Sequence, residues 1–412
     1  MTYQTENTID KRVKRVHDVV ALKEPDRVPF APSVGTGYLE GSGVSRFEAM
    51  IDIRNFKQPV ADFLSRYEVD LFWAPTIYPS NVMEVLGTQY IMWPGPTWGL
   101  DLNAPFQLCD MSFLGEDQYD EFIQDPTAFI FNKVFSARHK NLKGLEKAAL
   151  NNVIEFGHYA SLSSFADPDV QSALHCLMRA GEESAKWLQG SGENVEVAVA
   201  HHAPPAVLTG CTCAYDAFAD MLRGYINLPM DLMTIPDKVL AACDVMDVFS
   251  QQAIEGAAAM GVDYFFIPLH GGHDEMMSDA TYRKHYWPYL QKMILHAIDL
   301  GMTPYVLTEG PYNTRLEVLK EVPKGKVIYM FEQVDMALAK KVLGDTACIC
   351  GNFPNVSLLY GSKEKVVDLT KRMLDTCMPG GGFIMNCAIA LDNFKPELMD
   401  AWYETTMTYG VY

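Results

Sequence analysis

The sequence predicts an α/β protein built as a (β/α)8 TIM barrel. Three observations lead to this prediction: short apolar runs of β type alternate with longer helical patterns, most of these runs are nearly continuous in hydrophobicity, and there are eight of them. Parallel strands that are buried on both faces have this composition. No Gly-x-Gly-x-x-Gly turn occurs in the chain, so the sequence does not favour a dinucleotide-binding sheet.

Eight β-type runs define the predicted barrel in chain order. They cover residues 28–31, 71–74, 195–200, 264–268, 304–307, 327–331, 347–350 and 382–386. Helical patterns such as residues 280–300 and 363–377 separate the runs, as in βαβ units. Before the first run, apolar residues recur at helical spacing over residues 8–22, which predicts an amphipathic N-terminal surface helix. The solvated face of this helix is expected to carry the basic residues Lys11, Arg12, Lys14 and Arg15.

The connection after the second predicted strand is too long for a minimal barrel. Residues 79–151 contain tryptophans and prolines near their start and an acidic helical sequence afterwards. Loops that follow barrel strands lie at the carboxyl-terminal mouth, so we expect this insertion to act as a lid over the mouth. No linker divides the chain, and residues 1–412 are therefore expected to form a single barrel domain.

The composition excludes several classes of protein. Of the 412 residues, 49% are hydrophobic, which excludes an intrinsically disordered chain. The 52 acidic residues outnumber the 33 basic residues and give a net charge of -19, so no nucleic acid and no membrane surface is expected as a partner. No apolar stretch is long enough to span a membrane, and no signal core follows the polar N-terminus. The nine cysteines are typical of reduced thiols, so we expect a cytoplasmic protein.

Chemistry in a (β/α)8 barrel is expected at the carboxyl ends of the strands. Glu309, Glu332, Cys350 and Cys387 end or follow four successive predicted strands. Neighbouring strands lie about 4.8 Å apart, so these side chains can converge on one point, and carboxylate oxygen and thiolate sulfur both bind Zn²⁺. The sequence therefore predicts a zinc site held by Glu309 and Glu332, which also act in catalysis, together with one of the two cysteines.

Ordinary structural roles compete with this interpretation. A glutamate at a strand end is commonly a salt-bridge or helix-capping partner, and a cysteine in a barrel strand is commonly a small buried apolar residue. His202 and His270 follow the third and fourth predicted strands. They are candidates for substrate binding, with a hydrogen-bonded structural role as the alternative.

Aromatic residues gather around the second strand end and the insertion after it. Trp73, Tyr78 and Trp93 lie there, and Tyr312 and Asn313 follow the fifth predicted strand. A ring-shaped ligand needs flat apolar walls with few polar anchors, so we expect these residues to bind the substrate. Ordinary core packing is the alternative for the aromatic side chains.

Three segments resemble the uroporphyrinogen decarboxylase superfamily. They are Arg27-Val28-Pro29-Phe30, the stretch from Gly344-Asp345 to Cys350-Gly351-Asn352, and the stretch from Gly380 to Asn386-Cys387. The resemblance extends over most of the chain and is clearest in its second half. It implies a (β/α)8 barrel with one of two activities: decarboxylation of a porphyrinogen without a cofactor, or zinc-dependent methyl transfer to or from a corrinoid.

Departures from the family's motifs distinguish between its branches. The decarboxylases have an arginine-rich loop after the first strand, whereas residues 31–37 contain no arginine. The thiol-methylating enzymes end the fifth strand with His-x-Cys-Gly, whereas this chain has Glu309 there and keeps the family's later cysteine as Cys387. Glu332 falls where related zinc methionine synthases have a glutamate ligand. The resemblance thus favours Cys387 over Cys350 as the thiolate.

A carboxylate-rich zinc site suits an oxygen ligand better than a sulfur ligand. The resemblance then implies the methyltransferase component of an O-demethylase, which moves a methyl group from a methoxylated aromatic compound to the Co(I) corrinoid (cobalamin) of a partner protein. The implied partners are a corrinoid protein and a small aromatic methyl ether, and a homodimer is compatible with the sequence. The alternatives are a methylcorrinoid:thiol methyltransferase, a decarboxylase that resembles uroporphyrinogen decarboxylase, and a non-catalytic barrel that binds an aromatic ligand.

Overall fold

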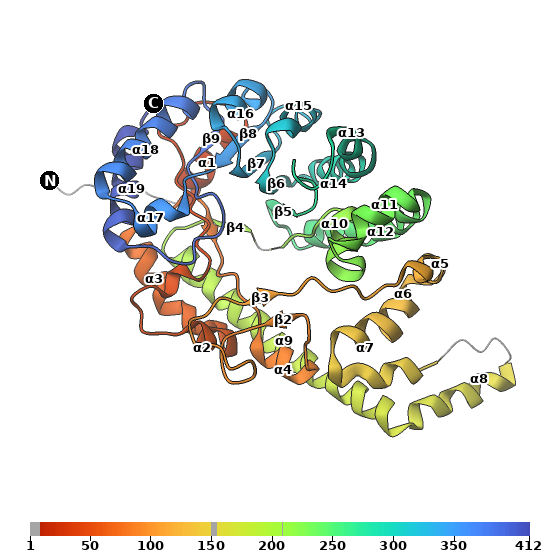
Figure 1. Cartoon of the computed structure of the whole chain (residues 1–412). Helices are drawn as coiled ribbons and strands as arrows, with labels where there is room; N and C mark the ends of the chain where they lie inside the picture. Colours follow the sequence, from red (N-terminus) through yellow and green to blue (C-terminus); the bar gives the residue numbers. More distant parts are fainter. Residues whose placement is uncertain (1–8, 150–154, 208) are drawn as a thin grey trace.

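The computed structural model describes residues 9–149, 155–207 and 209–412 of the chain. Helices make up 58% of the structure and lie around the outside of a group of parallel strands (Figure 1). The predicted α/β class is confirmed. No helix in these ranges is both long and apolar enough to cross a membrane.

The amino-terminal part begins with the predicted amphipathic helix. Its elements are α1 (Ile9–Val20), η1 (Thr36–Leu39), α2 (Arg46–Ile51), η2 (Ile53–Phe56), α3 (Lys57–Arg66) and β1 (Phe72–Trp73). Helix α1 turns Val16 and Val19 into the core, but it also buries Arg12 and Arg15, so the expectation of a wholly solvated basic face is wrong. The reason is a buried carboxylate beside the helix, because Arg15 forms an ion pair with the side chain of Asp70.

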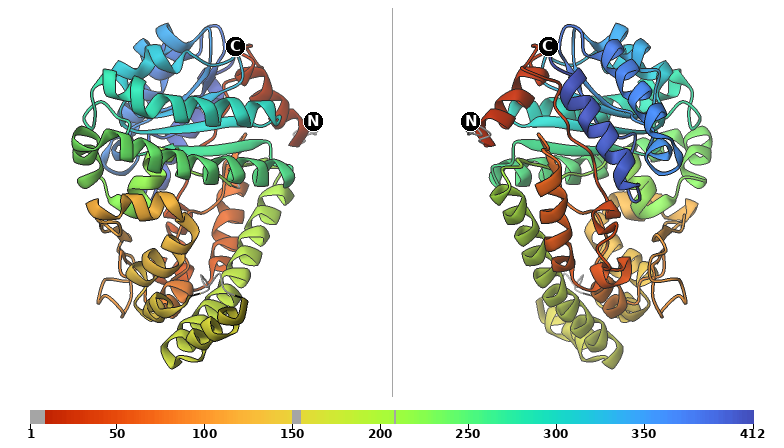
Figure 2. Two further views of the ribbon diagram at one scale, coloured as in Figure 1. Left: turned by 90° about the vertical axis from the view of Figure 1, so that its right-hand side faces the viewer. Right: turned by 90° about the vertical axis from the view of Figure 1, so that its left-hand side faces the viewer.

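A mostly helical segment follows β1. Its elements are α4 (Ser80–Leu86), β2 (Ile91–Met92), β3 (Gln107–Leu108), η3 (Glu116–Gln118), α5 (Tyr119–Gln124), α6 (Pro126–Phe129), η4 (Ile130–Val134), α7 (Phe135–Arg138), η5 (Lys140–Lys147), α8 (Glu155–Ser161), η6 (Leu162–Ala166) and α9 (Pro168–Ala200). Figure 2 shows this segment projecting from the part of the molecule that holds the parallel strands. The predicted insertion 79–151 lies within the segment, except that its last two residues fall outside the described residues.

The run 195–200, predicted as the third strand, is the end of helix α9, so that prediction is wrong. The side chain of Asp167 caps this 33-residue helix, 28 residues before the run begins. Asn194 and Ala198 are buried four residues apart, which is helical spacing. A short apolar run alone does not distinguish a strand from the last turns of a long helix. The strand that belongs at this place begins at Pro205.

The rest of the chain alternates strands and helices. Its elements are β4 (Pro205–Val207), α10 (Ala214–Phe218), η7 (Ala219–Arg223), α11 (Asn227–Thr234), α12 (Pro236–Ala259), β5 (Tyr264–Leu269), α13 (Asp279–Thr281), η8 (Tyr282–Tyr286), α14 (Trp287–Asp299), β6 (Thr303–Pro311), η9 (Asn313–Arg315), α15 (Leu316–Leu319), β7 (Ile328–Gln333), α16 (Met336–Leu343), β8 (Cys348–Gly351), α17 (Asn355–Tyr360), α18 (Lys363–Cys377), β9 (Phe383–Ile384) and α19 (Pro396–Tyr409). The segments η7 and η8 are short π-helices.

Strands β5 to β9 form one parallel sheet in the order of the sequence. Leu269 of β5 pairs with Thr308 of β6, and Thr308 pairs with Phe331 of β7. Phe331 in turn pairs with Gly351 of β8. The carboxyl ends of these strands are therefore level. Strands β1 and β4 form a separate parallel pair.

Single backbone contacts connect the two groups of strands. Phe30, in the first predicted strand, bridges Met385 next to β9, and its carbonyl oxygen accepts a hydrogen bond from the backbone N–H of Asp70 next to β1. On the other side, Gly210 after β4 bridges Phe266 of β5. In the part of the chain that the structure describes, the regular strand pairing does not close into a ring. The closed barrel of eight strands stays a prediction, which these contacts favour.

Side chains of the parallel strands alternate between two hydrophobic clusters. Tyr305, Met330 and Cys350 belong to one cluster, together with side chains of α1. Val306 and Ile349 point the other way and belong to the cluster that contains the outer helices. Both faces of the strands are therefore buried, which explains why their sequences are almost continuously apolar.

Candidate functional site

A cavity of about 480 Å³ lies at the carboxyl ends of the strands. Residues in or after strands β1, β4, β5, β6, β7 and β9 line this cavity. Further lining residues follow the run 28–31. Trp73, Phe266, Leu307 and Met330 contribute apolar walls. Among the described residues, Glu309 is the single charged side chain in the lining. The cavity thus combines flat apolar surface with one acidic anchor, as small-molecule sites commonly do.

Glu309 lies near the end of β6, beside His270. Its Oε1 is 3.9 Å from Nε2 of His270, and 36% of its side chain is exposed. Burial raises the pKa of Glu309, and the negative charge of Glu332 adds to this rise, while His270 opposes it. A larger fraction of Glu309 is therefore protonated near neutral pH than of a fully exposed glutamate.

His270 follows β5 directly and lies among carboxylates. Its Nδ1 is 3.0 Å from Oδ2 of Asp220, which belongs to the π-helix η7. Burial favours the neutral imidazole, but the hydrogen bond to Asp220 and the negative charges of Asp216, Asp220 and Glu309 outweigh burial and raise the pKa of His270 to about 9. The imidazole is therefore positively charged at pH 7.

Asp216 lies fully buried behind His270. Its two carboxylate oxygens accept hydrogen bonds from the backbone N–H groups of His270 (2.9 Å) and Gly271 (2.8 Å), and a further one from the hydroxyl of Tyr286. Burial raises the pKa of Asp216, although His270 and these hydrogen bonds oppose the rise. The carboxylate thereby holds the turn that follows β5 in one position.

Asp216 and Asp220 are site residues that the sequence analysis missed. They are four residues apart within the helical stretch α10–η7, so they lie on one side of it. Two acidic residues at this spacing in an otherwise apolar stretch are a signal that could have identified them.

The two predicted cysteine ligands are buried, do not line the cavity, and make hydrogen bonds to protein groups. Sγ of Cys350 lies 3.0 Å from the hydroxyl of Tyr305, and Sγ of Cys387 lies 3.3 Å from the hydroxyl of Ser33. Asn386 connects them, because its Nδ2 is 3.5 Å from Cys350 and its Oδ1 accepts from the backbone N–H of Cys387. Burial raises the pKa of Cys350 to about 12 and that of Cys387 to about 11. Both thiols are neutral at pH 7.

The predicted zinc ligands are not gathered at one point. Glu332 is directed to the backbone N–H of Gly310, at 2.6 Å. In residues 9–149, 155–207 and 209–412, no three His, Cys, Asp or Glu side chains lie close enough together to hold a metal ion. The arrangement of Glu309, Glu332, Cys350 and Cys387 in this structure therefore does not fit a zinc site.

The structure separates the residues that were expected to bind substrate. Trp73 lines the cavity. Tyr78 and Trp93 instead pack edge-on against other aromatic side chains of the insertion, at ring distances of 4.8 and 5.7 Å. Tyr312 is buried beside Tyr282, outside the cavity lining.

Two further expected residues have other places. Oδ1 of Asn313 accepts a hydrogen bond from the backbone N–H of Asp335, so this side chain joins two connecting segments. His202 is exposed and follows the last turn of α9, before β4 begins. It is therefore at the amino end of that strand, the end opposite to the cavity.

The insertion contacts the site through its helix α7. Nη1 of the buried Arg138 donates hydrogen bonds to the carbonyl oxygens of Asp220 (3.3 Å) and Met221 (3.0 Å). Its guanidinium also lies over the ring of Tyr90, 3.8 Å from the ring centre. No residue of 79–149 lines the cavity, so the insertion acts on the site through the backbone of Asp220 and Met221.

Comparisons with known proteins identify a family and a similar fold. The family described as Uroporphyrinogen decarboxylase (URO-D) matches residues 182–408, which is more than half of the chain. A search of curated proteins finds no match. Among solved structures, a methyltransferase from Methanosarcina mazei has a similar fold, with a TM-score of 0.62 and 14% sequence identity. That similarity covers 98% of this chain and 99% of the other.

Proposed function

Because the chain belongs to the uroporphyrinogen decarboxylase family, and because its cavity is apolar with one acidic anchor, we propose that it is a methyltransferase that demethylates a methoxylated aromatic compound. The single observation that carries the proposal is the position of Glu309 in a cavity walled by Trp73 and Phe266. The proposal also takes the parallel strands as one closed (β/α)8 barrel with the cavity at its mouth.

The walls of the cavity suit a flat ring. The ring of Trp73 is nearly perpendicular to that of Phe266, at 87° and 5.5 Å between ring centres, so the two side chains support each other. A volume of about 480 Å³ falls within the range of small-molecule sites and accommodates one substituted aromatic ring. Leu307 and Met330 complete an apolar surface that excludes water from the ring.

Glu309 is the group that acts on the ether oxygen in this proposal. When the bond between the methyl carbon and that oxygen breaks, both bonding electrons remain on the oxygen, which then takes up a proton. A protonated Glu309 supplies this proton, and its raised pKa increases the protonated fraction. The charged imidazole of His270, 3.9 Å away, stabilises the carboxylate that Glu309 leaves behind.

The methyl group needs an acceptor that is not a side chain of this chain. We propose the Co(I) corrinoid of a partner protein as this second substrate, since it supplies the electron pair of the new bond to carbon. Zinc enters no step of the proposal, because the expected ligand side chains are not gathered. Glu309 acts as an acid in place of the Lewis acid that the sequence analysis expected.

Decarboxylation of a porphyrinogen is the weaker candidate. A porphyrinogen carries several carboxylates, which arginine or lysine side chains would have to neutralise. The cavity lining contains neither residue type within the described ranges, and its one charged group is acidic. A thiol methyltransferase is also the weaker candidate, because neither Cys350 nor Cys387 lines the cavity.

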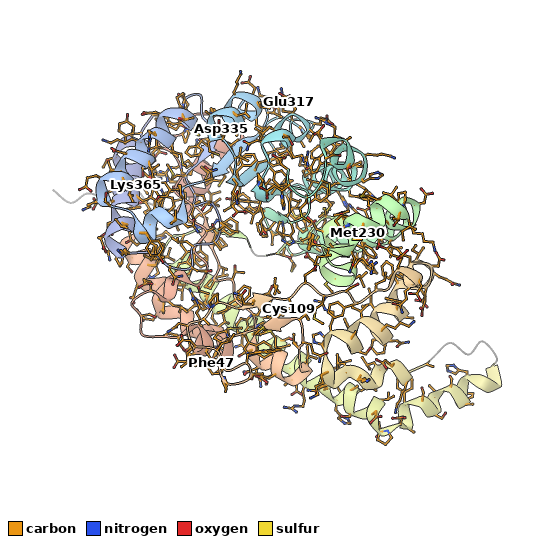
Figure 3. All side chains as sticks on the ribbon, in the orientation of Figure 1. Phe47, Cys109, Met230, Glu317, Asp335 and Lys365 are labelled. Atoms are coloured by element: carbon orange, nitrogen blue, oxygen red, sulfur yellow. The ribbon has the colours of Figure 1, made fainter. Side chains whose placement is uncertain are left out.

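The test is an assay with 2-methoxyphenol and reduced cobalamin as probes. We expect formation of catechol, coupled to loss of the Co(I) absorption, only when the protein is present. Glu309→Gln should lower the rate by about a hundredfold, because a general acid typically contributes 10²–10⁴-fold. Glu317→Gln is the matched control, since Glu317 lies on the outer face of the molecule (Figure 3). Full activity without a corrinoid, or release of carbon dioxide from a porphyrinogen, would overturn the proposal.

A further inference from the structure

The pair of Asp220 and His270 at the edge of the cavity carries a further inference. We propose that Asp220 is a positioning residue, which fixes the imidazole of His270 with the proton on Nδ1 and thereby directs Nε2 at Glu309 and the oxygen of the bound ligand. The part that concerns the ligand rests on the proposed function. The part that concerns the imidazole does not, because it follows from the hydrogen bonds of the free protein.

The distances define what the imidazole can do. Oδ2 of Asp220 is 3.0 Å from Nδ1 of His270, which is a hydrogen-bond distance, and a carboxylate can only accept there. Nδ1 therefore donates. Nε2 is 3.9 Å from Oε1 of Glu309, which is too long for a direct hydrogen bond. An oxygen atom placed between these two atoms can lie about 2.8 Å from each, so both groups can contact one ligand oxygen.

The backbone of His270 cannot move to compensate for a lost side-chain contact. Its N–H and that of Gly271 are both bound to the buried Asp216, which Tyr286 also contacts. A Cβ atom on Gly271 would lie only 2.9 Å from the ring of Tyr225 and 3.0 Å from Oδ1 of Asp216. With the backbone held on these sides, rotation of the imidazole is the remaining freedom, and the contact with Asp220 removes it.

The position of Asp220 is itself held by the fold. It belongs to the π-helix η7, whose carbonyl groups at Asp220 and Met221 accept hydrogen bonds from Arg138 of the insertion. Tyr286, the buried residue whose hydroxyl contacts Asp216, belongs to the other π-helix near the site, η8. Short π-helical segments occur frequently at functional sites. Asp220 of η7 contacts the imidazole of His270, and Tyr286 of η8 contacts Asp216. An ion pair at the protein surface would not require support from two such segments.

The experiment is nitrogen NMR of the full-length protein with ¹⁵N-labelled histidine, without any ligand. His270→Gln identifies the signals of His270. At a pH above the point where the imidazole loses its charge, we expect the wild type to keep the proton on Nδ1. Asp220→Ala should shift the population towards the Nε2-protonated form, and Asp220→Glu should restore the Nδ1 form in part. Asp120→Asn, which removes an equal charge from an exposed pair with Lys238, is the control and should change nothing.

Activity gives the second readout. Asp220→Ala should lower kcat for demethylation of 2-methoxyphenol by about tenfold to a hundredfold and leave KM almost unchanged, because Asp220 does not line the cavity. An unchanged tautomer in a folded Asp220→Ala variant would overturn the proposal. A changed tautomer in a protein with no demethylating activity would support the positioning role and refute the proposed function, so the two failures are distinguishable.

Discussion

Oε2 of Glu332 accepts a hydrogen bond of 2.6 Å from the backbone N–H of Gly310, the residue after Glu309. Gly310 has a φ of 78°, in the left-handed region, and a Cβ atom at this position would lie 2.9 Å from the ring of His273. Glu332 of β7 therefore holds the turn of the neighbouring strand that carries Glu309. This contact gives Glu332 a role that needs no metal ion.

Replacing Glu332 tests this role directly. In Glu332→Gln the side-chain carbonyl can still accept the hydrogen bond, so we expect unfolding in urea to remain close to that of the wild type. Glu332→Ala removes the acceptor and should lower the free energy of unfolding by about 1–2 kcal/mol. The exposed Glu317→Gln serves as the control for the loss of one negative charge. If Glu332→Gln instead removed zinc from a zinc-containing preparation, the contact with Gly310 would not be its main role.

Most of the parallel strands could be predicted from the sequence, and the reason is physical. The runs 264–268, 304–307, 327–331 and 347–350 coincide with β5 to β8, because strands with two buried faces must be apolar throughout. The run 195–200 failed because apolar residues occur on both the buried and the exposed sides of α9 at its end, where Ala198 is buried and Val199 is exposed. The apolar pattern of this run does not show how long the element is. The helix is indicated only by its N-terminal cap at Asp167.

The candidate site was predicted in part. Glu309 and Trp73 follow from their positions at strand ends, since the carboxyl ends of parallel strands lie on the same side of the molecule. Asp216 and Asp220 could not be placed by that rule, because they lie on a helix after a strand end and their direction depends on a π-helical turn. For Cys350 and Cys387 the role as zinc ligands stays a prediction. Both are buried and neither lines the cavity, which their positions at strand ends do not show.

The buried ion-pair network at the amino ends of the strands should be essential for stability. Asp70 is fully buried, pairs with Arg15 and Arg27, and accepts a hydrogen bond from the backbone N–H of Phe30. Asp70→Ala leaves two buried guanidinium groups without this partner, and we expect a loss of about 3–5 kcal/mol in the free energy of unfolding.

Urea unfolding measures this loss. The matched control is Asp18→Ala, which removes an ion pair with Lys14 at the surface of α1 and should cost less than about 0.5 kcal/mol. Because the network lies at the end of the strands opposite to the cavity, ligand affinity should change little in Asp70→Ala protein that remains folded. A loss below about 1 kcal/mol would contradict the structural role given to Asp70.

Access to the cavity should depend on Ala390, which is exposed and lies in the lining. Ala390→Trp places a large side chain at the opening without disturbing buried packing, so the melting temperature should not change. We expect the Kd of 2-methoxyphenol to rise at least about tenfold, measured through the fluorescence of Trp73 and the other tryptophans. Ala390→Ser controls for the change at this backbone position and should bind normally. Unchanged binding in Ala390→Trp would show that the ligand does not occupy this cavity.

The charge of His270 should make the stability of the protein depend on pH in a defined direction. Its pKa is about 9 in the folded protein, against an ordinary value of 6.5, because Asp220, Asp216 and Glu309 outweigh the effect of burial. The folded state binds this proton more tightly than the unfolded state, so the stabilisation is fully present below about pH 6.5 and is lost as the pH rises through about 9.

We therefore expect the melting temperature to fall between pH 6.5 and 9 in the wild type, and to fall less in His270→Gln. His17→Gln, at an exposed position of α1, should keep the wild-type slope. An NMR titration of the imidazole provides the direct measurement, and a midpoint near 6.5 would show that the three carboxyl groups do not hold the charge on His270.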